Sequence, residues 1–302
     1  MKADITVIGG GPAGMTAALY CAMSGAKTVL AEKGLFGGQM RLAETIENYP
    51  GILNINGAVL SEQMKKQILE NGVGIAEFEV SSIKKEHNKI ICSSTWKTIT
   101  SKALIIAAGS KKRQLGLEEE EKFVGHGLSY CALCDAVFFK GKTVAVIGSG
   151  SSAASEAIYL SNLCSKVYII IRNDKMKCSD TLMREISLKN NIEIINNSSV
   201  IRINGDSSVQ SVMLFNKVSK SYSTVYAKGI FVSIGTVPQT ESFSALVPCD
   251  KNGYIITDGN FHTAVNGIFA CGDCTTDIHQ ITTAIGSAAS AAVNACKYIK
   301  TV

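Results

Sequence analysis

The chain has 302 residues, 46% of them hydrophobic and 18% charged, which is long enough for about two domains at ~150 residues each. No run approaches the ~18 apolar residues that a membrane-spanning helix needs, and the net charge of +5 is spread along the chain rather than gathered into a basic stripe. We therefore expect a soluble globular protein with neither a membrane nor a nucleic acid as partner.

The first elements follow the order of a dinucleotide-binding βαβ unit. A strand at Ile5–Ile8 leads into the turn Gly9-Gly10-Gly11-Pro12-Ala13-Gly14. A helix is expected from about Met15 to Ser24, followed by a strand from Thr28 to Ala31 that ends in Glu32. No apolar signal region precedes the first strand, which favours a cytoplasmic protein.

The first turn has the residues that hold a dinucleotide. Its first glycine permits the tight turn, the second lets the backbone approach a pyrophosphate, and the third allows close helix packing. The phosphate then lies on the helix N-terminus, where unpaired N–H groups and the helix dipole favour an anion. The acid at the end of the second strand, about 20 residues on, can accept hydrogen bonds from ribose hydroxyls. The candidate cofactor residues here are Gly9, Gly11, Pro12, Ala13, Gly14 and Glu32.

A second copy of this order lies roughly 140 residues further on. A strand at Val144–Ile147 precedes the turn Gly148-Ser149-Gly150-Ser151-Ser152-Ala153, a helix through about Leu163, and a strand at Val167–Ile171. A pattern that recurs once per domain-sized length is stronger evidence for nucleotide binding than a single G-x-G-x-x-G.

Two short buried strands that end in tight turns indicate crossings between the domains: Ala103–Gly109 and Gly229–Gly235. From about residue 245 the chain resumes with a hairpin-like Asp250–Gly253, a strand near Gly267–Ala270 and a final Ala-rich helix. These last elements are expected to complete the first domain. The sequence therefore predicts an α/β protein with two Rossmann-like domains.

One pair of cysteines, Cys131 and Cys134, lies just before the second nucleotide strand. Two intervening residues let the sulfurs meet when the first cysteine begins a helix, so the pair can cycle between dithiol and disulfide. The helix N-terminus stabilises a thiolate, which is the species that attacks disulfides. Asp135 follows directly and can hold or deliver the proton that this chemistry needs. A solvated helix-cap aspartate is the alternative.

A second pair with the same spacing, Cys271 and Cys274, encloses Gly272 and Asp273. Spacing alone ranks it equally with the first pair. A zinc site made of both pairs is disfavoured, because roughly 136 residues separate them and structural zinc sites use closely spaced ligands. No metal is expected.

Together these features resemble the thioredoxin reductases of the low-molecular-weight flavoprotein type over nearly the full chain. The matching segments are Cys131-Ala132-Leu133-Cys134-Asp135, Gly37-Gly38-Gln39, Glu47-Asn48-Tyr49-Pro50-Gly51 and Cys271-Gly272-Asp273. The resemblance implies an FAD domain of residues 1–112 and 245–302, and an inserted NAD(P)H-type domain, 115–242, that carries the redox disulfide. It also implies a homodimer in which Cys134 is the flavin-proximal cysteine and Cys131 the one attacked by substrate.

The resemblance further implies which residues contact FAD. Asp273 would meet the ribityl chain, which makes Cys271 and Cys274 small packing residues rather than a redox pair. The segment His279-Gln280-Ile281 stands where the family has Arg-Gln-Ala beside the isoalloxazine ring, so the glutamine is kept and the arginine is lost. The implied FAD contacts are Gly38, Gln39, Asn48, Gly109, Asp273, Gln280 and Ile281.

The electron donor is open among NADPH, reduced ferredoxin and NADH. The second turn keeps Gly148, Gly150 and Ala153, so a pyrophosphate can lie on its helix. NADPH-using relatives carry His-Arg-Arg-x-x-x-Arg after the next strand, where cations clamp the 2′-phosphate. Here Arg172 is retained and Lys177 can replace the last arginine as a point charge. Some reductases of this build use ferredoxin, an acidic protein that a basic chain attracts. NADH ranks third, because no acid ends that strand.

We therefore predict a FAD-dependent thioredoxin-disulfide reductase that passes electrons from NADPH or reduced ferredoxin through Cys131 and Cys134 to thioredoxin. Two other functions stay open. One is an NADH-dependent disulfide reductase that serves a peroxiredoxin, although such chains usually carry an extra N-terminal redox domain. The other is a flavin-binding interaction protein without turnover, against which the intact cysteine pair with Asp135 argues.

Overall fold

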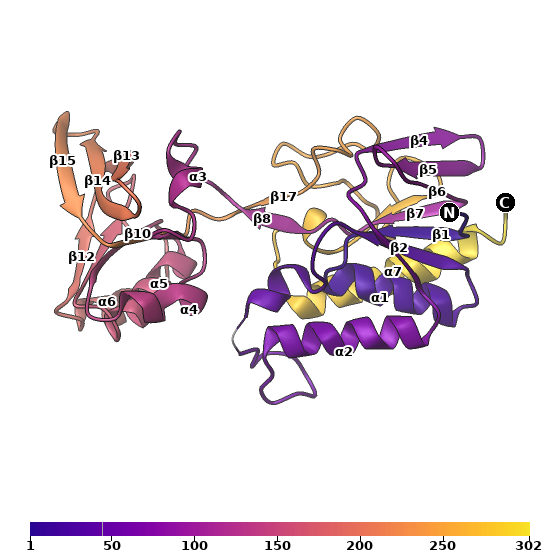
Figure 1. The fold of residues 1–302 in the computed structure, drawn as a ribbon, viewed down its shortest axis with the longest axis horizontal. Coiled ribbons are helices and arrows are strands. Elements are labelled where there is room, and N and C mark those ends of the chain that lie inside the picture. The colour runs from indigo at the N-terminus through magenta and orange to yellow at the C-terminus, as the bar shows by residue number, and fades with distance from the viewer. Residues whose placement is uncertain (44) are drawn as a thin grey trace. The chain divides into compact units, whose positions relative to one another are not determined.

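The computed structural model describes residues 1–43 and 45–302, which divide into two compact units. Unit 1 comprises Met1–Lys111 and Val237–Val302, and unit 2 comprises Lys112–Thr236. Unit 2 is therefore an insertion in the chain of unit 1 (Figure 1). Among the described residues, no helix has the length and apolar character needed to cross a lipid bilayer.

Unit 1 is built on a parallel sheet with the strand order β18-β7-β1-β2-β3. The strands are β1 (Ile5–Ile8), β2 (Thr28–Glu32), β3 (Gly74–Glu77), β7 (Ala103–Ile106) and β18 (Ile268–Ala270). Every position of β1 and β7 is buried, because both faces of the sheet are covered. This is why their sequences are nearly continuous apolar runs rather than alternating ones.

Helices cover one face of this sheet and a small antiparallel sheet covers the other (Figure 1). The helices are α1 (Pro12–Met23), α2 (Gly57–Glu70) and α7 (Ile281–Tyr298), with the short 3-10 helices η1 (Gly38–Leu42) and η3 (Gly272–Cys274). The antiparallel sheet consists of β4 (Ser82–Glu86), β5 (Lys89–Ser93) and β6 (Thr98–Ser101). Helix α1 begins three residues before the expected Met15, because Gly11 is its N-cap and proline suits the first helical position.

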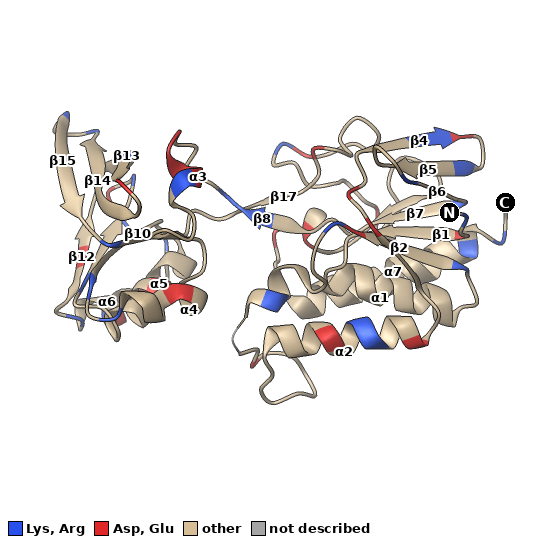
Figure 2. Ribbon diagram, in the orientation of Figure 1, with Lys and Arg blue, Asp and Glu red and all other residues tan. Residues whose placement is uncertain are grey.

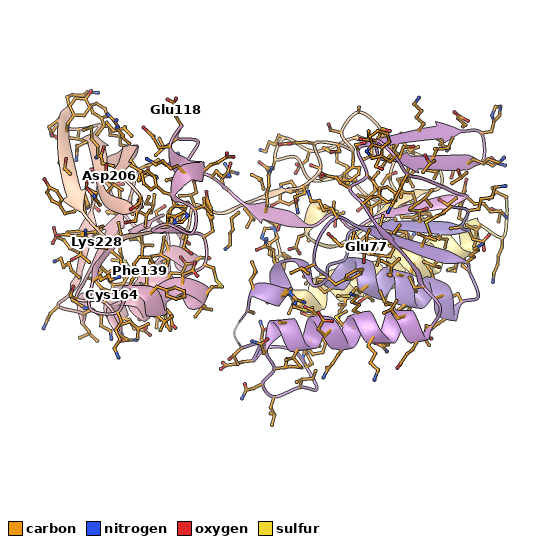
Figure 3. All side chains as sticks on the ribbon, in the orientation of Figure 1. Glu77, Glu118, Phe139, Cys164, Asp206 and Lys228 are labelled. Atoms are coloured by element: carbon orange, nitrogen blue, oxygen red, sulfur yellow. A yellow bond between two sulfur atoms is a disulfide. The ribbon has the colours of Figure 1, made fainter. Side chains whose placement is uncertain are left out.

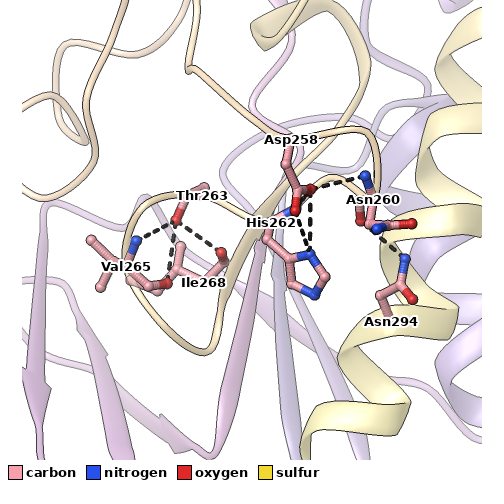
Figure 4. Close-up of polar contacts among 7 residues, drawn as sticks. All are labelled: Asp258, Asn260, His262, Thr263, Val265, Ile268 and Asn294. Atoms are coloured by element: carbon pink, nitrogen blue, oxygen red, sulfur yellow. Dashed lines mark hydrogen bonds and ion pairs between the residues drawn. The ribbon is translucent and has the colours of Figure 1, made fainter.

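A hydrogen-bonded loop leads into β18 and contacts α7 (Figure 4). The Asp258 carboxylate accepts the backbone N–H groups of Asn260 and His262, each at 2.9 Å. The Asn294 side chain on α7 donates to the Asn260 carbonyl at 3.0 Å. At the end of this loop, β18 pairs with β7 in the sheet that also contains β1.

Unit 2 repeats the plan with a parallel sheet in the order β12-β11-β10-β16-β9. Its strands are β9 (Leu128–Ser129), β10 (Thr143–Ile147), β11 (Lys166–Ile170), β12 (Ile192–Ile195) and β16 (Gly229–Val232). Its helices are α3 (Glu120–Phe123), α4 (Ala132–Asp135), α5 (Ser151–Ser161) and α6 (Asp180–Ser187), with the 3-10 helix η2 (Ala136–Phe139). One face of this parallel sheet is covered by three antiparallel strands, β13 (Ser198–Gly205), β14 (Val209–Asn216) and β15 (Ser221–Tyr226). The predicted α/β class is confirmed.

The two connections between the units are the short strands β8 (Ser110–Lys112) and β17 (Thr236–Pro238), which pair with each other. The sequence suggested that the second domain reaches residue 242, whereas unit 2 ends at Thr236. The difference arises because Gln239 donates its backbone N–H to the Gly109 carbonyl at 2.9 Å, and the Thr240 hydroxyl donates to the Gly253 carbonyl. Both contacts bind the segment after β17 to unit 1.

Candidate active site

The first glycine turn leaves open space at the N-terminus of α1. Gly9 has a φ of +106°, and a Cβ there would lie 2.2 Å from the Ala107 carbonyl oxygen. A Cβ at Gly14 would lie 1.7 Å from the Gly9 carbonyl oxygen. At the N-cap Gly11, in contrast, a Cβ would meet nothing within 4 Å, and no side chain caps the helix. Gly9 and Gly14 therefore lie where a larger residue would clash, and the uncapped start of α1 suits a pyrophosphate.

Glu32, at the end of β2, holds the loops around this turn. Its Oε2 accepts the Gly10 N–H at 2.5 Å, and its Oε1 accepts the Gly34 N–H at 2.8 Å. Each carboxylate oxygen has a second lone pair, so both can still accept a ribose hydroxyl. The side chain is half-buried, which places a fixed charge beside the helix start.

Several residues implied as FAD contacts lie together beside this turn. Gly38 starts η1, and a Cβ there would lie 3.3 Å from the Gly11 Cα atom. The Gln39 amide donates to the Ser110 carbonyl at 3.5 Å, and the Ser110 hydroxyl donates to Asp273 Oδ2 at 3.3 Å. Gly109, with a φ of +69°, precedes that serine. Segments far apart in sequence therefore converge on one place in unit 1.

The Asp273 carboxyl group is only partly in contact with water. Burial raises its pKa, while the His279 charge and the Ser110 hydrogen bond oppose that shift. Gly272 beside it has a φ of +73°, and a Cβ there would lie 2.7 Å from the Ala13 Cβ. The turn that carries Asp273 therefore packs directly against the start of α1, which suits a hydrogen-bond acceptor for a cofactor lying across that helix.

A further contact joins the other implied flavin residues. The Asn48 side chain donates to Gln280 Oε1 at 2.9 Å, although 232 residues separate the two. Gln280 is the N-cap of α7, and Ile281 is the first residue of that helix. No side chain caps α7 and no acidic residue lies in its first turn, so its N-terminus also provides unpaired N–H groups in unit 1.

In unit 2, Cys131 and Cys134 form a disulfide with a Cα–Cα distance of 5.4 Å. Cys131 is the N-cap of α4, and its Sγ accepts the Cys134 N–H at 3.2 Å. The Ser129 hydroxyl accepts the Cys131 N–H at 3.0 Å and donates to the Cys131 carbonyl at 3.2 Å. Ser129 belongs to β9, which pairs with β16. The central sheet therefore positions the disulfide through one serine.

The surroundings of this disulfide are accessible and apolar. Cys134 is exposed and Cys131 is half-buried. Leu133 is 49% exposed, and Val137 and Phe138 on η2 are 65% and 68% exposed. Large apolar side chains left in water mark contact surfaces when they cluster. Asp135, the last residue of α4, is half-buried and donates its backbone N–H to the Cys131 carbonyl at 3.3 Å.

The second cysteine pair has a different environment. Cys271 and Cys274 are completely buried and both are free thiols. The Cys274 thiol donates to the carbonyls of Cys271 and Ile106. Burial raises the pKa of Cys274 to about 11 and that of Cys271 well above its usual range. Both sulfurs are therefore held as neutral thiols.

The second glycine turn repeats the geometry of the first. Gly148 has a φ of +149°, and a Cβ there would lie 2.0 Å from the Ser233 carbonyl oxygen. Gly150 is the N-cap of α5 with open space around it, and Ala153 is buried in the helix. The unit 2 turn therefore also presents an uncapped helix start.

The two remaining cations of the expected phosphate clamp are exposed. Arg172 follows β11, and Lys177 donates its backbone N–H to the Ser149 carbonyl at 2.6 Å. That contact brings the backbone of Lys177 against the turn that precedes α5. Among residues 1–43 and 45–302, no group of three or more His, Cys, Asp or Glu side chains is arranged to hold a metal ion.

Sequence reasoning missed Ser110, which connects Gln39 with Asp273, and Ser129, which fixes Cys131. Ser129 lies two residues before a cysteine, a spacing at which a hydroxyl can bond the backbone N–H. Ser110 carries no comparable local signal, because its partners are remote in sequence.

Comparisons with known proteins agree with this geometry. The family model described as "Pyridine nucleotide-disulphide oxidoreductase" matches residues 3–288. A protein named thioredoxin reductase from Listeria innocua is 40% identical, with 98% of this chain and 94% of that protein covered. A Lactococcus lactis thioredoxin reductase crystal structure superposes with a TM-score of 0.89 and 38% identity, covering 99% of this chain and 100% of the other. A crystal structure of a Clostridium acetobutylicum ferredoxin-flavin thioredoxin reductase superposes with a TM-score of 0.55 and 30% identity, covering 100% of this chain and 99% of the other.

Proposed function

The chain belongs to the pyridine nucleotide-disulphide oxidoreductase family and, within it, to the thioredoxin reductases, and we propose that it reduces thioredoxin with electrons from NADPH. The observation that carries the proposal is an accessible disulfide, Cys131–Cys134, with exposed apolar side chains beside it. A homodimer, by resemblance to the family, is part of the proposal.

FAD is the cofactor whose binding the residues of unit 1 support best. The open N-terminus of α1 would hold its pyrophosphate, Glu32 a ribose, and Asp273 the ribityl hydroxyls. Gln39, Asn48 and Gln280 would supply amide groups nearby. When bound, FAD supplies the means to accept an electron pair from a donor and to reduce a disulfide.

The cysteine pair carries out the exchange with the protein substrate. In the dithiol form, the Cys131 thiolate attacks the thioredoxin disulfide, which forms a mixed disulfide and releases one thioredoxin thiolate. The Cys134 thiolate then attacks Cys131 Sγ, restores the internal disulfide and releases the second thiolate. Two electrons leave the pair, and two protons complete the reduced thioredoxin.

Three features support these roles. The Cys134 N–H donates to Cys131 Sγ, and such a hydrogen bond favours the thiolate over the thiol. Asp135 lies directly after Cys134, which suits a group that exchanges protons with the pair. The exposed side chains of Val137 and Phe138 would contact the apolar surface of the substrate protein.

NADPH is supported as donor by the second glycine turn. The space at Gly150 and the uncapped start of α5 suit a pyrophosphate. Lys177 lies against this turn and Arg172 is exposed on the adjoining loop, so both cations are available to a 2′-phosphate.

Reduced ferredoxin is a second candidate, because the phosphate clamp lacks the histidine and middle arginine of NADPH-using relatives. One similar crystal structure is titled a ferredoxin-flavin thioredoxin reductase. The net charge of +5 favours an acidic partner, although Lys and Arg are dispersed through both units (Figure 2).

Stopped-flow reduction of the bound flavin distinguishes the donors. NADPH, NADH and chemically reduced ferredoxin are mixed in parallel with the oxidised protein, and bleaching of the flavin is followed. The proposal expects NADPH to be fastest, and an Arg172→Ala/Lys177→Ala variant to lose this advantage. Fast bleaching by ferredoxin with none by NADPH would contradict NADPH as donor and leave the disulfide chemistry intact.

A further inference from the structure

One of four consecutive glutamates in unit 2 is buried. In the run Glu118–Glu121, the first and last side chains are exposed, as Glu118 illustrates in Figure 3, and Glu119 pairs with Arg202 at 3.6 Å. Glu120, the first residue of α3, is only 2% exposed. A buried carboxylate is costly unless hydrogen bonds replace its water, so its partners indicate why it is there.

Three donors surround the Glu120 carboxylate. Its Oε1 accepts the Leu115 N–H at 2.8 Å and the Tyr130 hydroxyl through a short hydrogen bond. Its Oε2 accepts the Gly116 N–H at 2.8 Å. Hydrogen bonds to an ionised acceptor are about twice as strong as neutral ones. One carboxylate therefore joins the segment that follows β8 to the residue that precedes Cys131.

Tyr130 has a constrained position between two anchors. Ser129 before it belongs to β9, and the Ser129 hydroxyl holds the backbone of Cys131. Burial and the hydrogen bond to Glu120 raise the pKa of Tyr130 well above its usual range. The phenol therefore stays protonated and remains the donor to Glu120.

We propose that Glu120 is the positioning residue of the redox pair: through Tyr130 it fixes the backbone from which Cys131 presents its sulfur to the substrate disulfide. This pair of residues, the Glu120–Tyr130 latch, rests on the proposed function, because it assumes that Cys131 is the cysteine that exchanges with thioredoxin. The Glu120 carboxylate acts through Tyr130, because its hydrogen-bond donors are the Tyr130 hydroxyl and the Leu115 and Gly116 amides rather than a group of either cysteine.

The latch matters because disulfide exchange is sensitive to geometry. The attacking sulfur must lie in line with the bond it breaks, and a misplacement of about 1 Å can cost about 10²-fold in rate. Cys131 is the N-cap of α4, a helix of only four residues, which restrains Cys131 weakly. Ser129 and the latch hold the chain on the N-terminal side of Cys131, where α4 does not reach.

The test compares Tyr130→Phe, which removes one hydroxyl group, with Glu118→Gln as a control in the same acidic run. Both are measured as full chains with bound flavin and Listeria innocua thioredoxin as substrate. Loss of one charge-assisted hydrogen bond corresponds to roughly a tenfold effect, so kcat/KM for thioredoxin should fall about tenfold in Tyr130→Phe. Single-turnover flavin reduction by the donor should stay within about twofold of wild type, because the latch acts on the exchange step.

A second variant checks that the two residues act together. Glu120→Leu removes the acceptor of the Tyr130 hydroxyl, so it should lower kcat/KM at least as much, and adding Tyr130→Phe should lower it no further, because both changes remove the same hydrogen bond. If Glu120→Leu does not fold, the comparison of Tyr130→Phe with Glu118→Gln decides alone.

A merely structural role gives a different result. Tyr130→Phe would then lower the melting temperature but leave kcat/KM per folded enzyme within about twofold of the Glu118→Gln control, and this outcome overturns the latch. A wild-type protein that does not reduce thioredoxin at all would contradict the proposed function, and the latch with it.

Discussion

The two cysteine pairs have the same spacing and opposite surroundings. Cys131 and Cys134 lie at the start of a short helix, are accessible and form a disulfide. Cys271 and Cys274 follow the buried strand β18, are completely buried and are free thiols. Two residues between cysteines permit a disulfide in both places, so the difference lies in solvent access and in the groups that contact the sulfurs.

The surroundings of each cysteine pair determine whether its sulfurs can take part in disulfide exchange or only fill space in the core. At the first pair a backbone N–H donates to Cys131 Sγ, which favours a thiolate. At the second pair the Cys274 thiol donates to two carbonyls, and burial raises its pKa to about 11. A thiolate is needed for exchange, so only the first pair is suited to it.

The largest expected effect follows from removing either sulfur of the first pair. Cys131→Ser and Cys134→Ser should each lower thioredoxin reduction by about 10³-fold or more, because each exchange step needs its own thiolate. Cys274→Ser is the matched control and should retain turnover within about threefold. Turnover is followed with thioredoxin and a chromogenic disulfide, and flavin absorbance checks that the cofactor stays bound. Normal activity in either of the first two variants would remove the distinction between the pairs.

Alkylation of the reduced, folded protein should distinguish the pairs by pH. The pKa of Cys274 is about 11, so its thiolate fraction at pH 8 is roughly 10⁻³, about 10²-fold below that of an ordinary thiol. Its reaction with iodoacetamide should rise about tenfold per pH unit up to its pKa. Cys131 should react fast at pH 8. Peptide mass spectrometry measures both rates, and equal rates at pH 8 would contradict the assigned environments.

Each cysteine pair also has a neighbouring aspartate, and replacing these two aspartates should have different effects. Asp135→Asn should slow thioredoxin reduction by about 10²-fold, the usual contribution of a positioned proton donor or acceptor. Asp273→Asn should instead weaken flavin retention, because that carboxyl group lies beside the start of α1. Rate and flavin content are measured in both variants. An Asp135→Asn enzyme with the wild-type rate and pH profile would identify Asp135 as a solvated helix residue.

The smallest effect is expected at the buried pair. Cys274→Ala removes one buried atom and two weak hydrogen bonds, so the free energy of unfolding should fall by about 1–2 kcal/mol. Turnover of the folded enzyme should be retained. Urea unfolding followed by circular dichroism measures the free energy of unfolding, and the thioredoxin assay measures turnover. A large loss of turnover with unchanged stability would assign Cys274 a chemical role.

Much of this organisation could be predicted from the sequence. Each glycine turn combines a conformational requirement with an apolar strand before it, and Gly9 and Gly148 have the positive φ that such a turn demands. The apolar run Ile268–Ala270 before Cys271 also indicates a buried strand end. Local patterns of this kind depend on neighbours in the chain, which the sequence displays directly.

The contacts between remote segments could not be predicted in this way. Four consecutive glutamates look alike in sequence, yet only Glu120 is buried, because the fold turns that one toward Tyr130 and the Leu115–Gly116 amides. The Asn48–Gln280 hydrogen bond likewise joins opposite ends of the chain. Such pairs depend on how whole elements pack, and resemblance to a family suggested Asn48 and Gln280 where periodicity did not.

Differential alkylation before and after reduction by NADPH tests the central claim most directly. Thiols of the oxidised protein are blocked with one isotopic reagent, the protein is reduced with excess NADPH, and newly formed thiols are labelled with a second reagent. If Cys131–Cys134 is the working disulfide, NADPH increases the second label at these two cysteines alone, and oxidised thioredoxin added before the second reagent prevents that increase. An NADPH-dependent increase of second label at Cys271 or Cys274, measured against a sample without NADPH, or no increase at Cys131 and Cys134 while the flavin is reduced, would contradict this assignment.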